Sequence, residues 1–167
     1  MTIEELNMLD DSALKNELIK CCGSTRWVKQ LIAEKPFRSL KDILLKAESS
    51  WHNTTEADWI EAFSHHPKIG DLKNLEKKFA STKAMAGNEQ SSVNSASLKT
   101  LERLAENNAL YENKFGFIFI VCATGKSADE MLNLLEARIN NDRATELKIA
   151  SQEQLKITLL RLQKLIS

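Results

Sequence analysis

Glycine and proline are scarce in this chain, which contains 5 Gly and 2 Pro among 167 residues. Together the two residue types make up about 12% of average protein sequences. Both interrupt helices and mark turns, and a β-sandwich or barrel needs many turns. Their scarcity therefore favours an all-α fold built from long helices.

The length and composition indicate one globular unit. A chain of 167 residues is close to the ~150 residues expected for one domain, so we expect a single domain over residues 1–167. Hydrophobic residues make up 43% and charged residues 28% of the chain, which is typical of a folded protein rather than a disordered one. A domain of this size buries roughly 70% of the surface that its unfolded chain exposes. It therefore needs no disulfide bonds to be stable.

Charge and apolar patterning exclude two classes of partner. Lys plus Arg and Asp plus Glu both number 23, and no basic stripe stands out, so we expect no nucleic acid. The longest apolar run, residues 115–123, is shorter than the ~20 residues of a membrane helix, so we expect no membrane span. The acidic N-terminus, the odd cysteine count and the lack of a C-terminal peroxisomal signal favour a cytoplasmic protein.

Capping and apolar spacing predict about eight helices. Thr2 with Glu5 and Ser127 with Glu130 have capping-box spacing. Four helices are expected before a loop at residues 65–70, with the first stopped by Gly23 and the fourth ending before Pro67. A short helix is expected from Asp71 and a surface loop over residues 80–88. Helices over 89–111, 128–140 and 144–166 complete the prediction.

Residues 115–123 depart from the helical pattern. They are rich in aromatic and β-branched side chains, which is typical of a buried strand, yet no second run of this kind is present to pair with them. Their backbone groups must form hydrogen bonds elsewhere. The segment is therefore either an extended core segment whose amides face a ligand, or a turn of helix, and the pattern does not decide between them.

Two adjacent histidines, His65 and His66, precede Pro67. Proline biases the residue before it towards an extended backbone, and histidine is the commonest general acid or base near neutral pH. A rigid loop of this kind can direct an imidazole towards a substrate. A surface turn without a catalytic role is the commoner explanation of such a pair.

The other chemically capable residues also have structural explanations. Adjacent cysteines and adjacent histidines do not match zinc-ligand spacing, so we expect no metal, and the three cysteines are expected in the core. Glu89 is placed either to bind a ligand or to complement a helix dipole. Arg161 is expected to be solvated by default, and the charged helix end at Glu136, Arg138, Asp142 and Arg143 is expected on the surface.

The ordered combination of motifs is more informative than any single one. His-His-Pro-Lys-Ile-Gly-Asp begins at His65, Asn-Glu-Gln at Asn88, Tyr-Glu-Asn-Lys-Phe-Gly-Phe-Ile-Phe-Ile-Val at Tyr111, Arg-Ile-Asn-Asn at Arg138, Glu-Leu at Glu146 and Lys-Ile-Thr-Leu-Leu-Arg-Leu at Lys156. From Leu9 to Leu162 this series resembles the OHCU decarboxylase family. That family converts 2-oxo-4-hydroxy-4-carboxy-5-ureidoimidazoline (OHCU) to (S)-allantoin in urate breakdown.

The resemblance implies a set of site residues. His66 and Glu89 match the catalytic residues of the family, and Pro67 adjoins the substrate. Other substrate-binding positions are expected at Ala86, Gly87, Asn88, Gln90, Phe119, Ile120, Val121, Cys122, Ala123 and Arg161. Ala86 stands where many members have serine, and Ile118 where proline is frequent, so a hydrogen bond and some loop rigidity are expected to be missing.

The resemblance further implies a carboxy-lyase that needs no cofactor, because the substrate ring itself accepts the electron pair released with CO2. It also implies a homodimer. Two alternatives stay open from the sequence: a helical interaction module with a groove for a partner helix, and a lyase or hydrolase acting on a related ureido compound.

Overall fold

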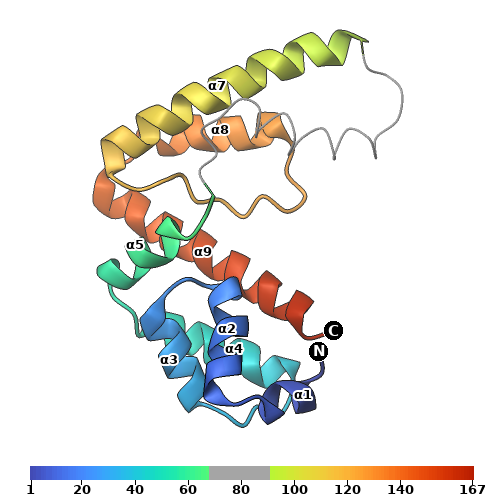
Figure 1. Cartoon of the computed structure of the whole chain (residues 1–167). Coiled ribbons are helices and arrows are strands. Elements are labelled where there is room, and N and C mark those ends of the chain that lie inside the picture. The colour runs from blue at the N-terminus through green and yellow to red at the C-terminus, as the bar shows by residue number, and fades with distance from the viewer. Residues whose placement is uncertain (68–90) are drawn as a thin grey trace. The chain divides into compact units, whose positions relative to one another are not determined.

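The computed structural model describes residues 1–67 and 91–167, except for the side chains of residues 91–97. Every regular element in these ranges is a helix, which confirms the all-α prediction (Figure 1). The helices are α1 (Ile3–Met8), α2 (Asp11–Cys21), α3 (Thr25–Ala33), α4 (Leu40–His52), α5 (Glu56–Ser64), α7 (Ser91–Phe115), α8 (Ala128–Arg138) and α9 (Arg143–Leu165). The helix predicted from Asp71 and the loop over 80–88 lie outside the described residues.

Side-chain caps set the helix boundaries. The capping boxes of Thr2 with Glu5 and Ser127 with Glu130 both form. One boundary differs from the prediction, because five helices rather than four precede His65. The extra break occurs where Leu9 is extended and the carboxylate of Asp10 accepts a hydrogen bond from the Ala13 amide, 2.7 Å away. Asp10 thereby starts a new helix inside the predicted one.

The chain forms two compact units, and the first comprises residues 1–66 and 147–167. Its core contains side chains from α1 to α5 and the C-terminal part of α9, including Leu14, Trp27 and Leu162, none of which is exposed. Two indole N–H groups are bonded inside it: that of Trp27 donates to Ala47 O at 2.9 Å, and that of Trp51 to Ser151 O at 3.1 Å. These bonds allow two large polar-tipped rings to be buried without an unpaired donor.

The second unit comprises residues 67–146. Within it α7 packs against α8, and four aromatic side chains form a cluster. The Tyr111 ring lies 4.6 Å from that of Phe115, 5.9 Å from that of Phe117 and 5.3 Å from that of Phe119, measured between centroids. Tyr111 and Phe115 belong to α7, whereas Phe117 and Phe119 follow it. The cluster therefore attaches the segment after α7 to the helix.

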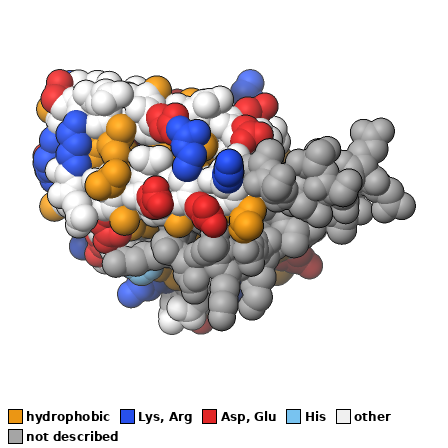
Figure 2. Space-filling model, turned by 90° about the horizontal axis from the view of Figure 1, so that it is seen from above, with side chains coloured by type: hydrophobic (Ala, Val, Ile, Leu, Met, Phe, Trp, Pro, Cys, Tyr) orange, Lys and Arg blue, Asp and Glu red, His pale blue; other side chains and the backbone are white. Residues whose placement is uncertain are grey.

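The described residues include no helix that is both long and apolar enough to cross a membrane. Figure 2 shows acidic and basic side chains lying near one another on one face, in keeping with the equal numbers of the two signs in the sequence. The expectation of a single domain over 1–167 stays a prediction.

Candidate functional site

His66 lies in a tight turn at the C-terminal end of α5. The amides of His65 and His66 donate to Ala62 O and Phe63 O at 3.2 and 3.1 Å, so two short-range bonds continue past the helix. Pro67 follows and cannot extend this ladder, because it has no amide hydrogen. The His66 side chain is half-buried, and Pro67 is exposed. The backbone therefore fixes the point from which the His66 imidazole projects.

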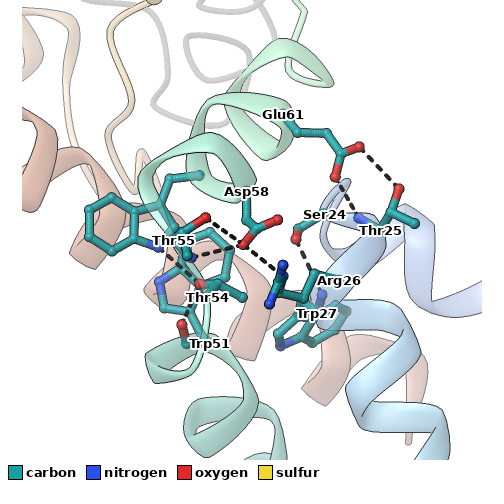
Figure 3. A network of polar contacts seen from close by, with 10 residues as sticks. Ser24, Thr25, Arg26, Trp27, Trp51, Thr54, Thr55, Asp58 and Glu61 are labelled. Atoms are coloured by element: carbon teal, nitrogen blue, oxygen red, sulfur yellow. Dashed lines mark hydrogen bonds and ion pairs between the residues drawn. The ribbon is translucent and has the colours of Figure 1, made fainter.

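A polar network holds α5 against the start of α3 (Figure 3). Glu61 accepts from the amide and the hydroxyl of Thr25 at 2.6 and 3.0 Å. Asp58 forms an ion pair with Arg26 at 3.1 Å. Helix α5 is thus tied by both carboxylates to residues at the N-terminus of α3, where exposed amides need acceptors. This attachment stabilises the helix that carries the histidine turn.

Gly23 makes room for the histidine turn. A Cβ atom at this position would lie 2.3 Å from Cγ and 2.6 Å from Cβ of His65. No real side-chain atom approaches another so closely, so only glycine fits without displacement. The link between α2 and α3 therefore packs directly against the residue that precedes His66.

The imidazole of His66 reaches α9. Its Nε2 lies 2.6 Å from Oε1 of Gln154, whose side chain is fully buried. Gln154 Nε2 in turn donates to Thr158 Oγ1 at 3.1 Å, one helical turn further along α9. Neither Gln154 nor Thr158 was singled out by sequence reasoning. Their spacing is a sequence signal, since residues at i and i+4 share a helix face, and Thr158 lies within the motif that begins at Lys156.

Arg161 belongs to the same stripe of α9 as Gln154. Seven residues separate them, which is close to two full turns and a rise of about 10.5 Å. The Arg161 side chain is exposed, and its Nη1 donates to Lys20 O at 3.4 Å. It borders a surface hollow lined also by Glu17, Lys20, Cys21, Lys164 and Leu165. The structure thus places Arg161 in solvent contact, on the stripe of α9 that His66 contacts.

The predicted extended segment forms in the second unit. Residues 116–123 are neither helix nor strand, which decides the alternative left open by the sequence. Phe119, Ile120, Val121 and Cys122 are all at least 92% buried. No described residue accepts a hydrogen bond from the amides of residues 118–121. Whether this segment binds a substrate stays a prediction.

A buried charged cluster holds this segment and corrects one prediction. Arg138 was expected on the surface but is only 7% exposed. Its Nη1 donates to Ile120 O at 2.7 Å, its Nε donates to Glu146 at 2.6 Å, and its guanidinium lies 4.5 Å from the Phe119 ring centroid. Tyr111 donates to the same carboxylate at 2.5 Å. A helix-end position gave no sign that this arginine turns inward towards a buried carboxylate.

The three cysteines are buried and form no disulfide, in agreement with the core prediction. Burial raises the pKa of Cys21 and Cys22 to about 11. Thiols that stay protonated near neutral pH are poor nucleophiles. Among the described residues no three His, Cys, Asp or Glu side chains are grouped as metal ligands would be.

Five predicted site residues lie outside the described residues: Ala86, Gly87, Asn88, Glu89 and Gln90. The described ones divide between the units. His66 and Arg161 belong to the first, whereas Pro67 and the segment 119–123 belong to the second. Their assembly into one site stays a prediction.

Comparison with known proteins gives consistent results. The model of the OHCU decarboxylase family matches residues 7–163. The chain is 40% identical over 148 residues to the uric acid degradation bifunctional protein TTL of Arabidopsis thaliana, covering 88% of this chain and 45% of that protein. The match therefore spans less than half of this relative's length. It is 26% identical over 166 residues to a 2-oxo-4-hydroxy-4-carboxy-5-ureidoimidazoline decarboxylase of Halalkalicoccus jeotgali, covering 99% and 92% of the two chains.

A solved structure adds to these relatives. The crystal structure of an OHCU decarboxylase in the presence of (S)-allantoin superposes with a TM-score of 0.71 at 38% identity, covering 90% of this chain and 96% of that one. The family match spans nearly all of the helices described above. The chain belongs to the OHCU decarboxylase family.

Proposed function

We propose that this protein is a carboxy-lyase that decarboxylates OHCU to (S)-allantoin in urate breakdown, without a cofactor. The observation that carries this proposal is the 38% identity to an OHCU decarboxylase solved in the presence of (S)-allantoin, of which this chain covers 96%. The relative from Arabidopsis thaliana, named for uric acid degradation, is in agreement with it.

The reaction requires an acceptor for an electron pair. When the bond from C4 to the carboxylate breaks, CO2 leaves and the pair moves into the ring through C5 and its conjugated C=N, where the nitrogen takes up a proton. The resulting enol loses the proton of the 4-hydroxyl and gains one at C5. Because the ring accepts the pair, the protein need only orient the substrate and move protons.

We assign these tasks to individual residues by their chemistry and by the family resemblance. His66 accepts the proton of the 4-hydroxyl and controls its delivery to one face of C5, which sets the S configuration. A positioned acid or base of this kind contributes about 10²- to 10⁴-fold. Arg161 supplies positive charge for the carboxylate, and the amides of 119–123 donate to ring oxygens. Glu89 is the second catalytic residue that the resemblance implies, and Pro67 with residues 86–90 lines the substrate.

The handedness of the product tests the proposal. Free OHCU also loses CO2 spontaneously, so the enzyme must supply speed and stereochemistry. Freshly generated OHCU mixed with the protein should give optically active allantoin, followed by polarimetry. Allantoin offered as the substrate should remain unchanged. Racemic product at the spontaneous rate would contradict the proposal, and consumption of allantoin would instead favour a hydrolase or lyase acting on a ureido compound.

Replacement of His66 by alanine provides the matching variant. We expect stereospecific turnover to fall by about 10²-fold or more, because no group then moves the proton, while the helical circular dichroism is retained. The control is His52→Ala, which removes an exposed histidine of α4 and should leave turnover unchanged. Full activity of the His66 variant would rule out the assignment of His66 as the group that moves the proton.

Two further properties belong to this proposal. A homodimer and a cytoplasmic location are both inferred from the family resemblance and the sequence. Sedimentation equilibrium should give twice the mass of 18.9 kDa, and a monomer at micromolar concentration would contradict the dimer.

A further inference from the structure

The side chain of Gln154 lies between the imidazole of His66 and the hydroxyl of Thr158. On one side its Oε1 lies 2.6 Å from Nε2 of His66, and on the other its Nε2 lies 3.1 Å from Oγ1 of Thr158. Gln154 is not exposed at all, and Thr158 is 1% exposed. Buried polar groups of this kind need hydrogen-bond partners. The donor and acceptor of each bond therefore determine the orientation of the amide and the protonation of the imidazole.

The hydroxyl of Thr158 determines how the amide is turned. A threonine hydroxyl has a single hydrogen, and this one is donated to the backbone carbonyl of Gln154 at 2.9 Å. Its oxygen can then only accept from Gln154, which places the amide nitrogen towards Thr158 and the amide oxygen towards His66. The neighbouring thiol of Cys22 does not compete as an anionic acceptor, since its raised pKa keeps it protonated near neutral pH.

The amide oxygen in turn determines the protonation of the ring. An oxygen acceptor facing Nε2 of His66 requires that this nitrogen carry a hydrogen. In a neutral imidazole one nitrogen donates and the other accepts. The lone pair must then be on Nδ1, and the imidazolium forms by adding a proton at that atom.

We propose that Gln154 and Thr158 are positioning residues that keep His66 as the Nε2–H tautomer, so that Nδ1 is the atom that takes and returns the proton. In the reaction Nδ1 accepts the 4-hydroxyl proton and later releases a proton to C5, while the Nε2–H bond to Gln154 persists throughout. The tautomer follows from the hydrogen bonds alone, whereas its use in catalysis rests on the proposed function.

Nuclear magnetic resonance of the full-length protein tests the tautomer without substrate. Long-range ¹H–¹⁵N correlation spectra of labelled protein, above the pH at which His66 titrates, should show a proton-bearing Nε2 and an unprotonated Nδ1. The Nε2 proton should appear downfield and exchange slowly with solvent. In Gln154→Leu this signal should be lost. A proton on Nδ1 of the native protein, or an Nε2 proton unaffected by Gln154→Leu, would overturn the proposal.

Kinetics distinguish positioning from mere packing. Gln154→Leu should lower kcat by about 10-fold or more, which is part of the 10²- to 10⁴-fold that a positioned general base contributes. Gln154→Glu keeps an oxygen acceptor and adds a negative charge that stabilises the imidazolium, so the acidic limb of the pH profile of kcat/KM should move about one unit or more towards higher pH. Thr158→Val should also lower kcat, because the side-chain amide of Gln154 can then rotate and turn its nitrogen towards His66.

Matched controls come from the same helix. Gln152 is exposed on α9, and Gln152→Leu and Gln152→Glu should alter neither the His66 signals nor the pH profile. If Gln154 only fills space, Gln154→Leu will leave kcat and the Nε2 proton signal of His66 unchanged, and the proposal fails. If native protein shows the Nε2 proton but does not turn over OHCU, the proposed function fails while the tautomer assignment stands.

Discussion

In the His65–His66 turn, Gly23, which has no side chain, determines where a histidine that we propose to be catalytic can lie. His66 is fixed by short backbone bonds at the end of α5 and by the contact of its ring with Gln154. His65 packs over Gly23 with no space for a Cβ atom. The catalytic imidazole that we propose therefore depends on a glycine 43 positions earlier in the chain.

Replacing Gly23 by alanine should disturb this turn. The new methyl group would overlap His65, and overpacking of this kind costs about 1–3 kcal/mol. We expect a lower free energy of unfolding in urea and a reduced kcat, since His66 moves together with its neighbour. The change should cost less in a His65→Gly background, which removes all three contacting atoms. An equal cost in both backgrounds would show that the contact is unimportant.

At the scale of elements, two ion pairs between described residues of the second unit differ in environment. Arg138 pairs with Glu146 at 2.5 Å, with side-chain exposures of 9% and 0%. Arg103 of α7 pairs with Glu136 of α8, with exposures of 59% and 37%. Burial makes the loss of one partner costly, because the remaining charge has no water to solvate it.

Methionine in place of each arginine tests this difference. Arg138→Met leaves Glu146 charged and buried and should destabilise the protein by about 3–5 kcal/mol. It also removes the donor to Ile120 O, so the 119–123 segment should exchange its amide hydrogens faster. Arg103→Met, the matched control, should cost about 0–1 kcal/mol. Equal effects in chemical denaturation would refute the assignment of a structural role to the buried pair.

At the scale of the whole molecule, stability should depend on alkaline pH. Burial raises the pKa of Cys21 and Cys22 from 9.0 to about 11, so the folded state holds protons that the unfolded state has already released. The stabilisation is therefore complete below pH 9 and is lost as the pH rises from about 9 to 11. Burial raises the pKa of Tyr111 as well, which adds to the loss above pH 10.

Urea unfolding of reduced protein at several pH values measures this dependence. The decline above pH 9 should be smaller in a Cys21→Ala, Cys22→Ala double variant. Cys122→Ala, which removes a buried thiol from the second unit, should keep the decline because the other two thiols remain. A double variant with an unchanged slope would show that these thiols do not govern alkaline stability.

Sequence reasoning succeeded where information is local. The capping boxes at Thr2 and Ser127 depend on side chains three residues apart, and both formed as predicted. It missed the helix break at Asp10, because an aspartate there is compatible both with a continuing helix and with a cap. It placed Arg138 on the surface, because a charge at a helix end is usually solvated and its buried partner lies on another helix.

The amino-acid sequence alone determined the all-α class, most helix boundaries and the family motifs, since these depend on short-range spacing and on the order of residues along the chain. Only the tertiary structure decided that residues 116–123 are neither helix nor strand, that Arg138 faces inward and that His66 meets Gln154 across 88 positions. Such contacts join residues far apart in the chain. Their energies come from burial and hydrogen bonding that exist only once the helices have packed.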